Sequence, residues 1–530
     1  MEKEIKIYDT TLRDGIQGAG INPSVEEAIK IAKTLDNFGI DYIEGGWPGT
    51  NPNADEFFKK MLKINLKHAV LTSFGSTRKA GIDASEDKNL QALINSQTPV
   101  VTIFGKSWLE HVKMMKGNTP EENLKMISES IEFLKSHNRE VIYDAEHFFD
   151  GYKDNPKYAI KTLIKATEAG ADYLTLCDTN GGTLPFELEK NLEDIFYSLD
   201  KYFDVNEKTR KYKLGIHAHD DSGLATANSL TAINYGCKMV QGTINGFGER
   251  IGNADLITLM ANFKLKINFN FYAEKNMKNL TKFSKQINKL TSQPDNPKQP
   301  FVGKDALAHK GGVHVSAVLK KPSLYEHFNP NAVGNKRHIL GSNQAGKSNI
   351  VSLAEEFKLD LSDKNISNIL EEIKKKEKEG YAYDKAPDSL RLLFLKESGG
   401  YKELFKLDSC ETVTTINKLG EEEAKSILQL KGGTLMESWG NGPVNALNKA
   451  LLKALIEQGL KNLDIKLTDY NIEIINREKG SAAKTRVFIT TKDTKTDKSW
   501  KTTGVSTDII SASFEALKEA SEYKLLGLDK

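Results

Sequence analysis

Two histidines separated by one residue are the first candidates for chemistry in this chain. His217 and His219 lie in the apolar run KLGIHAH, which continues directly into Asp220 and Asp221. If the run is a β-strand, side chains two positions apart leave the same face, so both imidazoles point the same way. With a carboxylate from the first expected strand they would make a three-ligand site, with open positions, for a divalent cation. Such a ligand set suits Mn²⁺, Zn²⁺ or Co²⁺ and leaves Mg²⁺ possible.

Further polar residues follow other apolar runs. The segment DTTLRDG near the N-terminus offers Arg13 and Asp14 in adjacent positions. EVIYDAE brings in Asp144 and Glu146, and DYLTLCD is followed by Thr179. A later run leads into NGFGERIGN (245–253). If these runs are strands of one barrel, their carboxyl ends meet at one mouth, where barrel enzymes place their active sites.

The first ~265 residues do alternate short β-branched runs with longer amphipathic segments. In VEEAIKIAKTLDNFG, for example, apolar residues recur at helical spacing before Gly39. The succession of strand–helix units, at a repeat near 30 residues, predicts a parallel (β/α)₈ barrel. An open doubly wound sheet is the alternative, because periodicity alone does not show closure. The expected strands are 5–9, 41–46, 68–74, 100–105, 140–146, 172–178, 213–219 and 238–244.

The pattern of apolar and polar residues changes after the expected barrel. PDNPKQPF (294–301) marks a break, and a charged helical pattern follows at 362–379. From ~400, runs such as YNIEIIN and TRVFITT alternate like strands of a half-exposed antiparallel sheet. WGNGPVNALNKALLKAL and WKTTGVSTDIISASFEAL echo each other, which indicates a duplicated small α+β unit. We therefore expect three parts: a barrel at 1–285, linker subdomains at 286–400, and an effector-binding or dimerising domain at 401–530.

Composition restricts the partners. A formal net charge of +2 gives no basic field, so nucleic acid is not expected. No apolar run approaches membrane-spanning length, and the N-terminus lacks a signal-peptide h-region. Three cysteines without C-x-x-C spacing support neither a disulfide framework nor a thiolate zinc site. These features predict a cytoplasmic enzyme without a membrane partner.

GSNQAGKS at 341–348 fits the phosphate-loop pattern. A working phosphate loop follows a buried strand and is completed by a later strand that ends in Asp. Here only the charged NKRHIL precedes the loop, and the next apolar run, RLLFL, leads to Lys396. ATP is therefore not among the expected ligands.

Several motifs in order resemble the 2-isopropylmalate, homocitrate and citramalate synthases, relatives of 3-hydroxy-3-methylglutaryl-CoA lyase. The resemblance covers essentially the whole chain, and its carriers are DTTLRDG, GIHAHDDSGLATAN, GFGERIGN, KGGVHVSAV, YEHFNPNAVG and GNGPVNAL. DAEHFFDGY and EGGWPGTNP resemble the citramalate-synthase branch most. That branch implies condensation of pyruvate with acetyl-CoA and water, opening a route to isoleucine. An isopropylmalate or homocitrate synthase is the alternative; a CoA-ester lyase and a non-catalytic amino-acid sensor are less favoured.

The resemblance also implies roles for single residues. Asp14, His217 and His219 would hold the divalent metal ion, with Asn253 completing or adjoining its sphere. Arg13 would bind the carbonyl oxygen or the carboxylate of the 2-oxo acid. Thr179 would bind the carboxylate.

Glu146, His314 and Tyr325 would together perform acid–base work and thioester hydrolysis. The last two would reach over the barrel mouth, in one arrangement from a partner subunit, so a homodimer is expected. An amino-acid effector, isoleucine or leucine, would bind the C-terminal domain.

One position departs from the family pattern. The family commonly continues D-G-E-Q after the arginine, whereas this chain has Ile16 before Gln17. The departure puts a secondary contact in doubt but not the metal ligand. We expect a compact acceptor pocket, lined by Phe74 and Phe104, that suits the methyl group of pyruvate and crowds an isopropyl group.

Overall fold

The computed structural model describes residues 4–416, 418 and 420–529, and these form two compact units. The first unit contains the residues up to Leu307 together with Phe328–Lys336. The second contains Ala308–His327 and the residues from Arg337 onwards. The three-part division at 285 and 400 stays a prediction.

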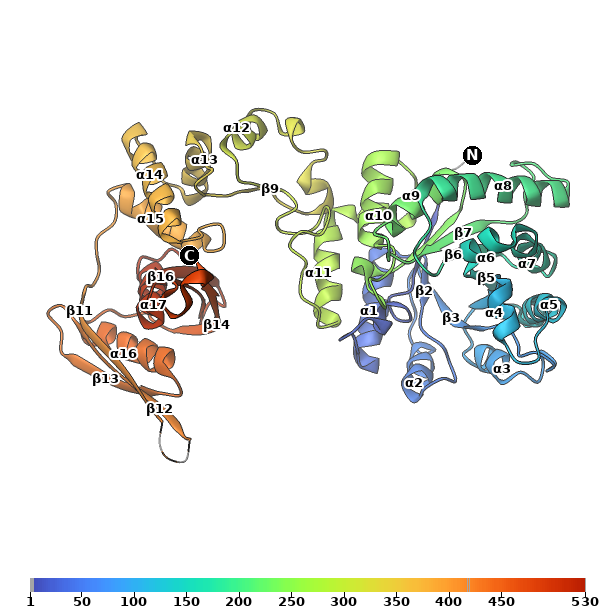
Figure 1. The fold of residues 1–530 in the computed structure, drawn as a ribbon, viewed down its shortest axis with the longest axis horizontal. Coiled ribbons are helices and arrows are strands. Elements are labelled where there is room, and N and C mark those ends of the chain that lie inside the picture. Colours follow the sequence, from blue (N-terminus) through green and yellow to red (C-terminus); the bar gives the residue numbers. More distant parts are fainter. Residues whose placement is uncertain (1–3, 417, 419, 530) are drawn as a thin grey trace. The chain divides into compact units, whose positions relative to one another are not determined.

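Within the described residues, the first unit is a closed barrel of eight parallel strands in chain order, drawn in Figure 1. Strand β1 pairs with β8, where Tyr8 lies opposite Gln241, and this pairing closes the sheet. The predicted barrel is therefore confirmed, and the open-sheet alternative is wrong. The strands are β1 Lys6–Asp9, β2 Tyr42–Glu44, β3 Val70–Ser76, β4 Val100–Lys106, β5 Glu140–Glu146, β6 Tyr173–Asp178, β7 Leu214–Ala218 and β8 Met239–Gly242.

Capping residues mark the two ends of helix α1 in the barrel. Helix α1 starts with a capping box between Ser24 and Glu27. It ends at Gly39, whose φ of 101° belongs to the left-handed region that favours glycine. The main helices of the first unit are α1 Val25–Phe38, α2 Pro52–Met61, α3 Lys88–Asn95, α4 Leu109–Met114, α5 Pro120–Ser136, α6 Phe148–Asp154, α7 Pro156–Glu168, α8 Pro185–Phe203, α9 Ala225–Asn234, α10 Leu256–Asn262 and α11 Leu280–Leu290.

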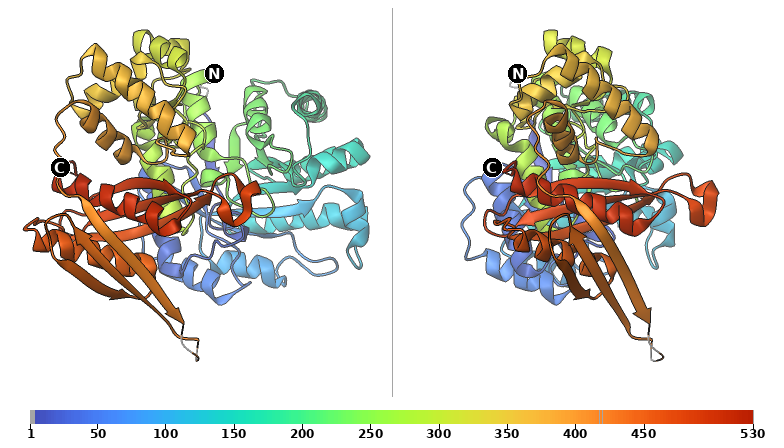
Figure 2. Two further views of the ribbon diagram at one scale, coloured as in Figure 1. Left: turned by 60° about the vertical axis from the view of Figure 1, so that its left-hand side comes forward. Right: turned by 90° about the vertical axis from the view of Figure 1, so that its left-hand side faces the viewer.

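The second unit begins with helices and continues with a repeated α+β pattern. There are two antiparallel sheets of three strands each, and each sheet is followed by its own helix. The two similar Trp-Gly segments predicted this repeat. The long strands β11 and β12 run side by side in both views of Figure 2. The elements are α12 Gly312–Lys320, α13 Lys347–Phe357, α14 Asp363–Glu379, α15 Pro387–Glu397, β11 Leu407–Ile416, β12 Glu422–Leu430, β13 Leu435–Gly440, α16 Pro443–Glu457, β14 Ile465–Ile474, β15 Thr485–Asp493, β16 Ser499–Ser506 and α17 Ile509–Leu525.

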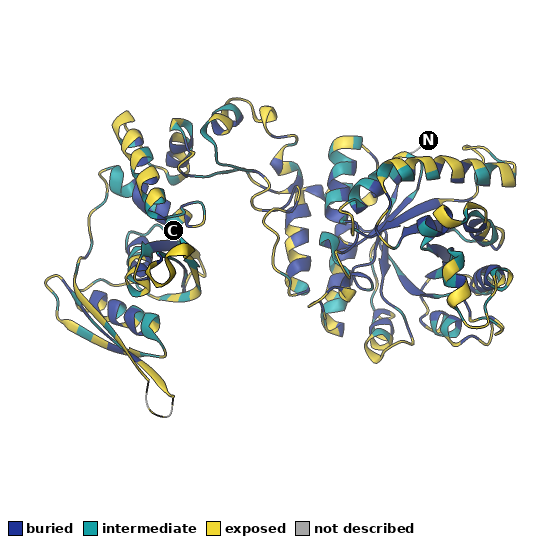
Figure 3. Ribbon diagram, viewed as in Figure 1, coloured by how far each residue is buried: buried dark blue, intermediate teal, exposed yellow. Residues whose placement is uncertain are grey.

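Burial separates core from surface in both units. The barrel strands are dark blue in Figure 3, whereas many surrounding helices show one buried and one exposed face. Ile7 and Ile43, on neighbouring strands, are fully buried in the barrel core. In the second unit, Leu451 of α16 and Leu517 of α17 belong to one apolar cluster, so the two repeats share a core.

The phosphate-loop-like stretch lies between β10 (His338–Ile339), a strand of two residues, and helix α13. The ammonium group of Lys347 pairs there with Asp363 at 2.6 Å. No helix among the described residues is long and apolar enough to cross a membrane.

Candidate active site

Three side chains positioned by strands β1 and β7 meet at the carboxyl end of the barrel. Asp14 follows β1, His217 belongs to β7, and His219 comes directly after that strand. One ligand atom from each residue lies within 4.8 Å of the others, and all three residues are buried. Oδ2 of Asp14 is 3.2 Å from Nε2 of His217, and the two Nε2 atoms of the histidines are 3.4 Å apart.

The donor atoms of these three side chains suit a bound cation. Nδ1 of His217 is 2.9 Å from Oε1 of Gln241, which can only accept, so Nδ1 carries a proton and Nε2 is the nitrogen that faces Asp14 and His219. Burial lowers the pKa of His219 to about 3, so that ring is neutral at ordinary pH. Oδ2 of Asp14 is buried without a hydrogen-bond partner, despite its proximity to His217. Two imidazole nitrogens and a carboxylate oxygen converging on one point fit a divalent metal ion.

Gln241 was missed by the sequence reasoning. Its Nε2 donates to Oδ1 of Asp144 at 2.9 Å and to Oγ1 of Thr175 at 3.1 Å, which fixes the orientation of its amide. The residue is fully buried on β8. A polar amide inside the apolar run KMVQGTI is the signal that could have revealed it. The amide oxygen fixes the orientation of the His217 ring, as hydrogen-bond partners of metal-binding histidines commonly do.

Arg13 is held between two carboxylates. Its Nη1 lies 2.7 Å from Oδ1 of Asp14, and its Nε lies 2.7 Å from Oε2 of Glu44. The guanidinium covers the ring of Phe74, 3.9 Å from the ring centroid. Burial opposes the charged form of Asp14, but the guanidinium of Arg13 and the ring of His217 hold the pKa of Asp14 well below its usual range.

Glu44 is the second residue that sequence reasoning missed. It is fully buried at the end of β2, where it also accepts a hydrogen bond of 2.7 Å from the hydroxyl of Tyr8. A glutamate directly after an apolar strand segment, in YIEGG, is the signal that was available.

Glu146 and Thr179 lie at the ends of β5 and β6. Glu146 is the register partner of Lys106 on β4, and their side chains form an ion pair. Oγ1 of Thr179 accepts a hydrogen bond of 2.9 Å from the backbone N–H of His147, which leaves its own proton free to donate. Nη2 of Arg250 donates to the carbonyl oxygen of Thr179 at 2.8 Å.

Asn253 lies beside the histidines. It forms a backbone bridge with His219, and its Nδ2 donates to the carbonyl oxygen of Phe247 at 3.1 Å. Its Oδ1 is buried without a hydrogen-bond partner. An unpartnered amide oxygen at this place suits a metal ligand or a neighbour of the metal sphere.

His314 and Tyr325 belong to the second unit. Their rings stack with centroids 4.4 Å apart, and both side chains are exposed. The pairing of these two residues was not predicted from the sequence, and their catalytic roles remain predictions. Neighbouring His309 pairs instead with Glu326 at 3.1 Å.

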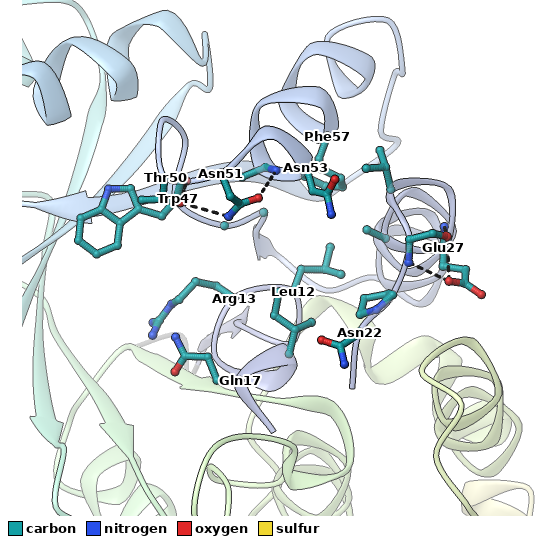
Figure 4. A pocket seen from close by; sticks show the side chains of 18 of the residues that line it. Leu12, Arg13, Gln17, Asn22, Glu27, Trp47, Thr50, Asn51, Asn53 and Phe57 are labelled. Atoms are coloured by element: carbon teal, nitrogen blue, oxygen red, sulfur yellow. Dashed lines mark hydrogen bonds between the residues drawn. The ribbon is translucent and has the colours of Figure 1, made fainter. Parts of the chain in front are cut away.

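A cavity of about 730 Å³ opens beside Arg13. It lies between the loops that follow β1 and β2 and the first turns of α1 and α2. Figure 4 shows Arg13 and Trp47 at one end of this cavity and Asn22 and Glu27 at the other. Its inner end is therefore next to the predicted metal site.

Comparison with known proteins places these features in a class. Residues 4–287 match the model of the HMGL-like family, which covers the barrel and all its predicted metal ligands. Residues 301–380 match the homocitrate synthase post-HMGL domain-like family, and residues 384–525 match the LeuA allosteric (dimerisation) domain. The barrel and its Asp–His–His cluster thus define an HMGL-like protein with a LeuA-type C-terminal domain.

Full-length relatives narrow the class. The chain is 46% identical to an (R)-citramalate synthase of Aquifex aeolicus, over 99% of this chain and 98% of that protein. It is 44% identical to the (R)-citramalate synthase of Geobacter sulfurreducens, over 98% and 97% of the two chains. A 2-isopropylmalate synthase of Aquifex aeolicus is 29% identical over 98% of this chain and 96% of its own length. The chain belongs to the (R)-citramalate synthase family.

Proposed function

We propose that this chain is a metal-dependent acyltransferase that condenses pyruvate with acetyl-CoA and water to give citramalate and CoA. The observation that carries the proposal is the convergence of Asp14, His217 and His219 on one point, directly beside the guanidinium of Arg13. Relatives named (R)-citramalate synthase, at 39–46% identity over nearly the full chain, support the substrate assignment.

The acceptor would bind over this cluster. Asp14, His217 and His219 would hold a divalent ion, and Asn253 would complete or adjoin its sphere. When bound, such an ion polarises a keto group and stabilises negative charge on its oxygen. The guanidinium of Arg13 would donate a hydrogen bond to the keto oxygen or the carboxylate. It would thereby add a second positive charge beside that of the ion.

The acceptor carboxylate would also meet Thr179. The hydroxyl of Thr179 keeps a free proton because its oxygen already accepts from the N–H of His147. It can therefore donate to a carboxylate oxygen.

The donor would enter through the cavity beside Arg13. Its inner end carries Arg13, Trp47 and Phe74, so a thioester arm that fills the cavity brings its methyl carbon to the acceptor carbonyl. The acid–base group of Glu146, His314 and Tyr325 would remove a methyl proton, and the new carbon–carbon bond leaves a citramalyl thioester. The same group would then direct water to the thioester, releasing CoA and the free acid.

The alternatives are supported less well. A CoA-ester lyase would need a catalytic cysteine in a mobile Gly-rich loop near the barrel mouth. Cys177 and Cys237 are buried, and Cys410 lies on β11. The 2-isopropylmalate synthases are more distant relatives than those named citramalate synthase.

The regulatory assignments form part of the same proposal. The match to a LeuA allosteric domain supports a homodimer and inhibition by isoleucine or leucine through the C-terminal region. We further propose a cytoplasmic place in isoleucine biosynthesis, and a domain division at 1–285, 286–400 and 401–530.

A CoA-release assay with a panel of 2-oxo acids tests the proposal. Thiol release from acetyl-CoA should require both pyruvate and a divalent metal ion. A strong preference for 2-oxoisovalerate or 2-oxoglutarate would contradict the substrate assignment. Binding of isoleucine or leucine without turnover of any 2-oxo acid would instead identify an amino-acid sensor.

A further inference from the structure

Trp47 closes an aromatic box next to the catalytic arginine. Its ring meets the rings of Phe74 and Phe104 edge-on, with centroid distances of 5.8 Å and 5.6 Å. Those two phenylalanines stack on each other at 5.5 Å. Phe74 and Phe104 were expected from the sequence to line the acceptor pocket. Trp47 lies in EGGWPGTNP, a segment that resembles the citramalate-synthase branch.

The position of the Trp47 ring is fixed from two directions. Its Nε1 donates to Oδ1 of Asn89 at 2.8 Å, while Nδ2 of Asn89 donates to the carbonyl oxygen of Ser76 at 2.6 Å. Both ends of the Asn89 amide are therefore committed, and only its oxygen can accept from the indole. On the backbone side, Gly46 has a φ of 120°, a conformation that glycine adopts without strain. These contacts restrict rotation of the indole away from the two phenylalanine rings.

The box adjoins the place where the keto group would bind. The guanidinium of Arg13 lies on the ring of Phe74 and pairs with Asp14, so one arginine joins the box to the metal cluster. Arg13, Trp47 and Phe74 line the same cavity, and Figure 4 shows Trp47 and Arg13 at the same end of it. An acceptor held by its oxygens at Arg13 would turn its alkyl group toward these rings.

We propose that Trp47, locked by Asn89, is the residue that limits the size of the acceptor's alkyl group. This inference rests on the proposed function. In this arrangement a methyl group would pack against the phenylalanine rings, and an ethyl or isopropyl group would meet the indole. Because the Asn89 bond holds the ring, the box does not widen by rotation of the indole. One methylene in an apolar pocket changes kcat/KM by about 10- to 200-fold, so one ring is enough to decide between 2-oxo acids.

The test compares kcat/KM for pyruvate, 2-oxobutyrate and 2-oxoisovalerate in the full-length, metal-loaded enzyme at saturating acetyl-CoA. Any effect of a substitution on the donor is common to all three acceptors and cancels in their ratios. In Trp47→Leu, the ratio of 2-oxobutyrate to pyruvate should rise at least about tenfold. Asn89→Leu keeps the indole but removes its acceptor, and should raise the ratio by about threefold.

Two further variants make the comparison decisive. Trp439→Leu removes an exposed tryptophan from β13 of the second unit and should leave the ratios at the wild-type values. Trp47→Phe keeps an aromatic ring without the indole N–H, and should fall between wild type and Trp47→Leu. If Trp47→Leu does not fold, Trp47→Phe and Asn89→Leu decide the question.

Equal losses for all three acceptors, with ratios within twofold of wild type, would overturn the inference, since Trp47 would then support only the fold or the donor site. Wild-type protein that releases no thiol with pyruvate would refute the proposed function itself. The two failures are therefore distinguishable.

Discussion

At the scale of the residue, Gln241 decides which nitrogen of His217 faces the cluster. Its amide is fixed by Asp144 and Thr175, so its oxygen can only accept from Nδ1 of His217. The ring is thereby held with Nε2 facing Asp14 and His219. Such outer partners typically change metal affinity by about 10- to 100-fold.

Replacing Gln241 by Leu should therefore weaken metal binding by about 10- to 100-fold. Titration of the chelator-treated protein with Mn²⁺, followed by calorimetry, measures the effect directly. Gln286→Leu, a change of the same kind on helix α11, serves as the control. An unchanged dissociation constant for the folded Gln241 variant would show that His217 is oriented by other means.

Asp144 should make the metal-free protein less stable as the pH rises. Burial raises its pKa to about 7, whereas the pKa of an aspartate in the unfolded chain is about 3.9. The stability from its neutral form is complete below the unfolded pKa and is lost as pH rises through the folded pKa. Asp144→Asn keeps an oxygen for Gln241 and removes the titration.

The measurement is denaturant unfolding at pH 5 and pH 8 in the presence of a chelator. The stability of Asp144→Asn relative to wild type should rise by roughly 2 kcal/mol between the two pH values. A difference that is the same at both pH values would mean that Asp144 is already ionised in the folded protein at pH 5.

At the scale of the element, the strands were predictable and several buried contacts were not. EVIYDAE coincides with β5, because a β-branched run between turn residues is a local signal. The closure of the barrel depends on β1 meeting β8, which no local pattern reports. The partners of Arg13 and His217 include Glu44 and Gln241, and their burial depends on register between distant strands.

The predicted metal ligands illustrate the same limit. The motif with His217 and His219 indicated one face of one strand, and Asp14 was added through the family resemblance. The structure brings the three together, whereas His314 and Tyr325 lie in the second unit. Local sequence reports the residues and their strands; long-range pairing determines which of them meet.

The Gly-rich loop before Asn253 should tolerate no side chain at Gly252. That residue has a φ of 112°, and a Cβ there would collide with the carbonyl oxygen of Gly246. Gly252→Ala should displace the loop, and with it Asn253, lowering metal affinity and the pyruvate-dependent rate by about tenfold or more. Gly442→Ala, where a Cβ meets open space, is the matched control. Full activity of Gly252→Ala would separate this loop from the metal site.

At the scale of the whole molecule, the second unit should carry regulation. Residues 384–525 match the LeuA allosteric domain, and helix α15 belongs with it: Leu392 clusters with Trp500 and Tyr523. A deletion from about residue 400 would remove Trp500 and Tyr523 and leave Leu392 exposed. Leu390 and Phe394 of the same helix pack with Ile369 of α14, so a cut on either side of α15 exposes apolar side chains.

An enzyme shortened from about residue 384 should keep pyruvate-dependent thiol release and lose its inhibition by isoleucine or leucine. Inhibition curves of the full-length and shortened proteins, measured at the same acetyl-CoA concentration, provide the comparison. Unchanged inhibition of the shortened enzyme would reject an effector site in the C-terminal region.

The most direct test of the central claim is anomalous diffraction from crystals of the full-length protein grown with Mn²⁺ and pyruvate. We predict one strong peak within coordination distance of Oδ2 of Asp14 and Nε2 of both His217 and His219, with pyruvate beside Arg13. A peak elsewhere, or pyruvate bound away from these three side chains, would contradict the account.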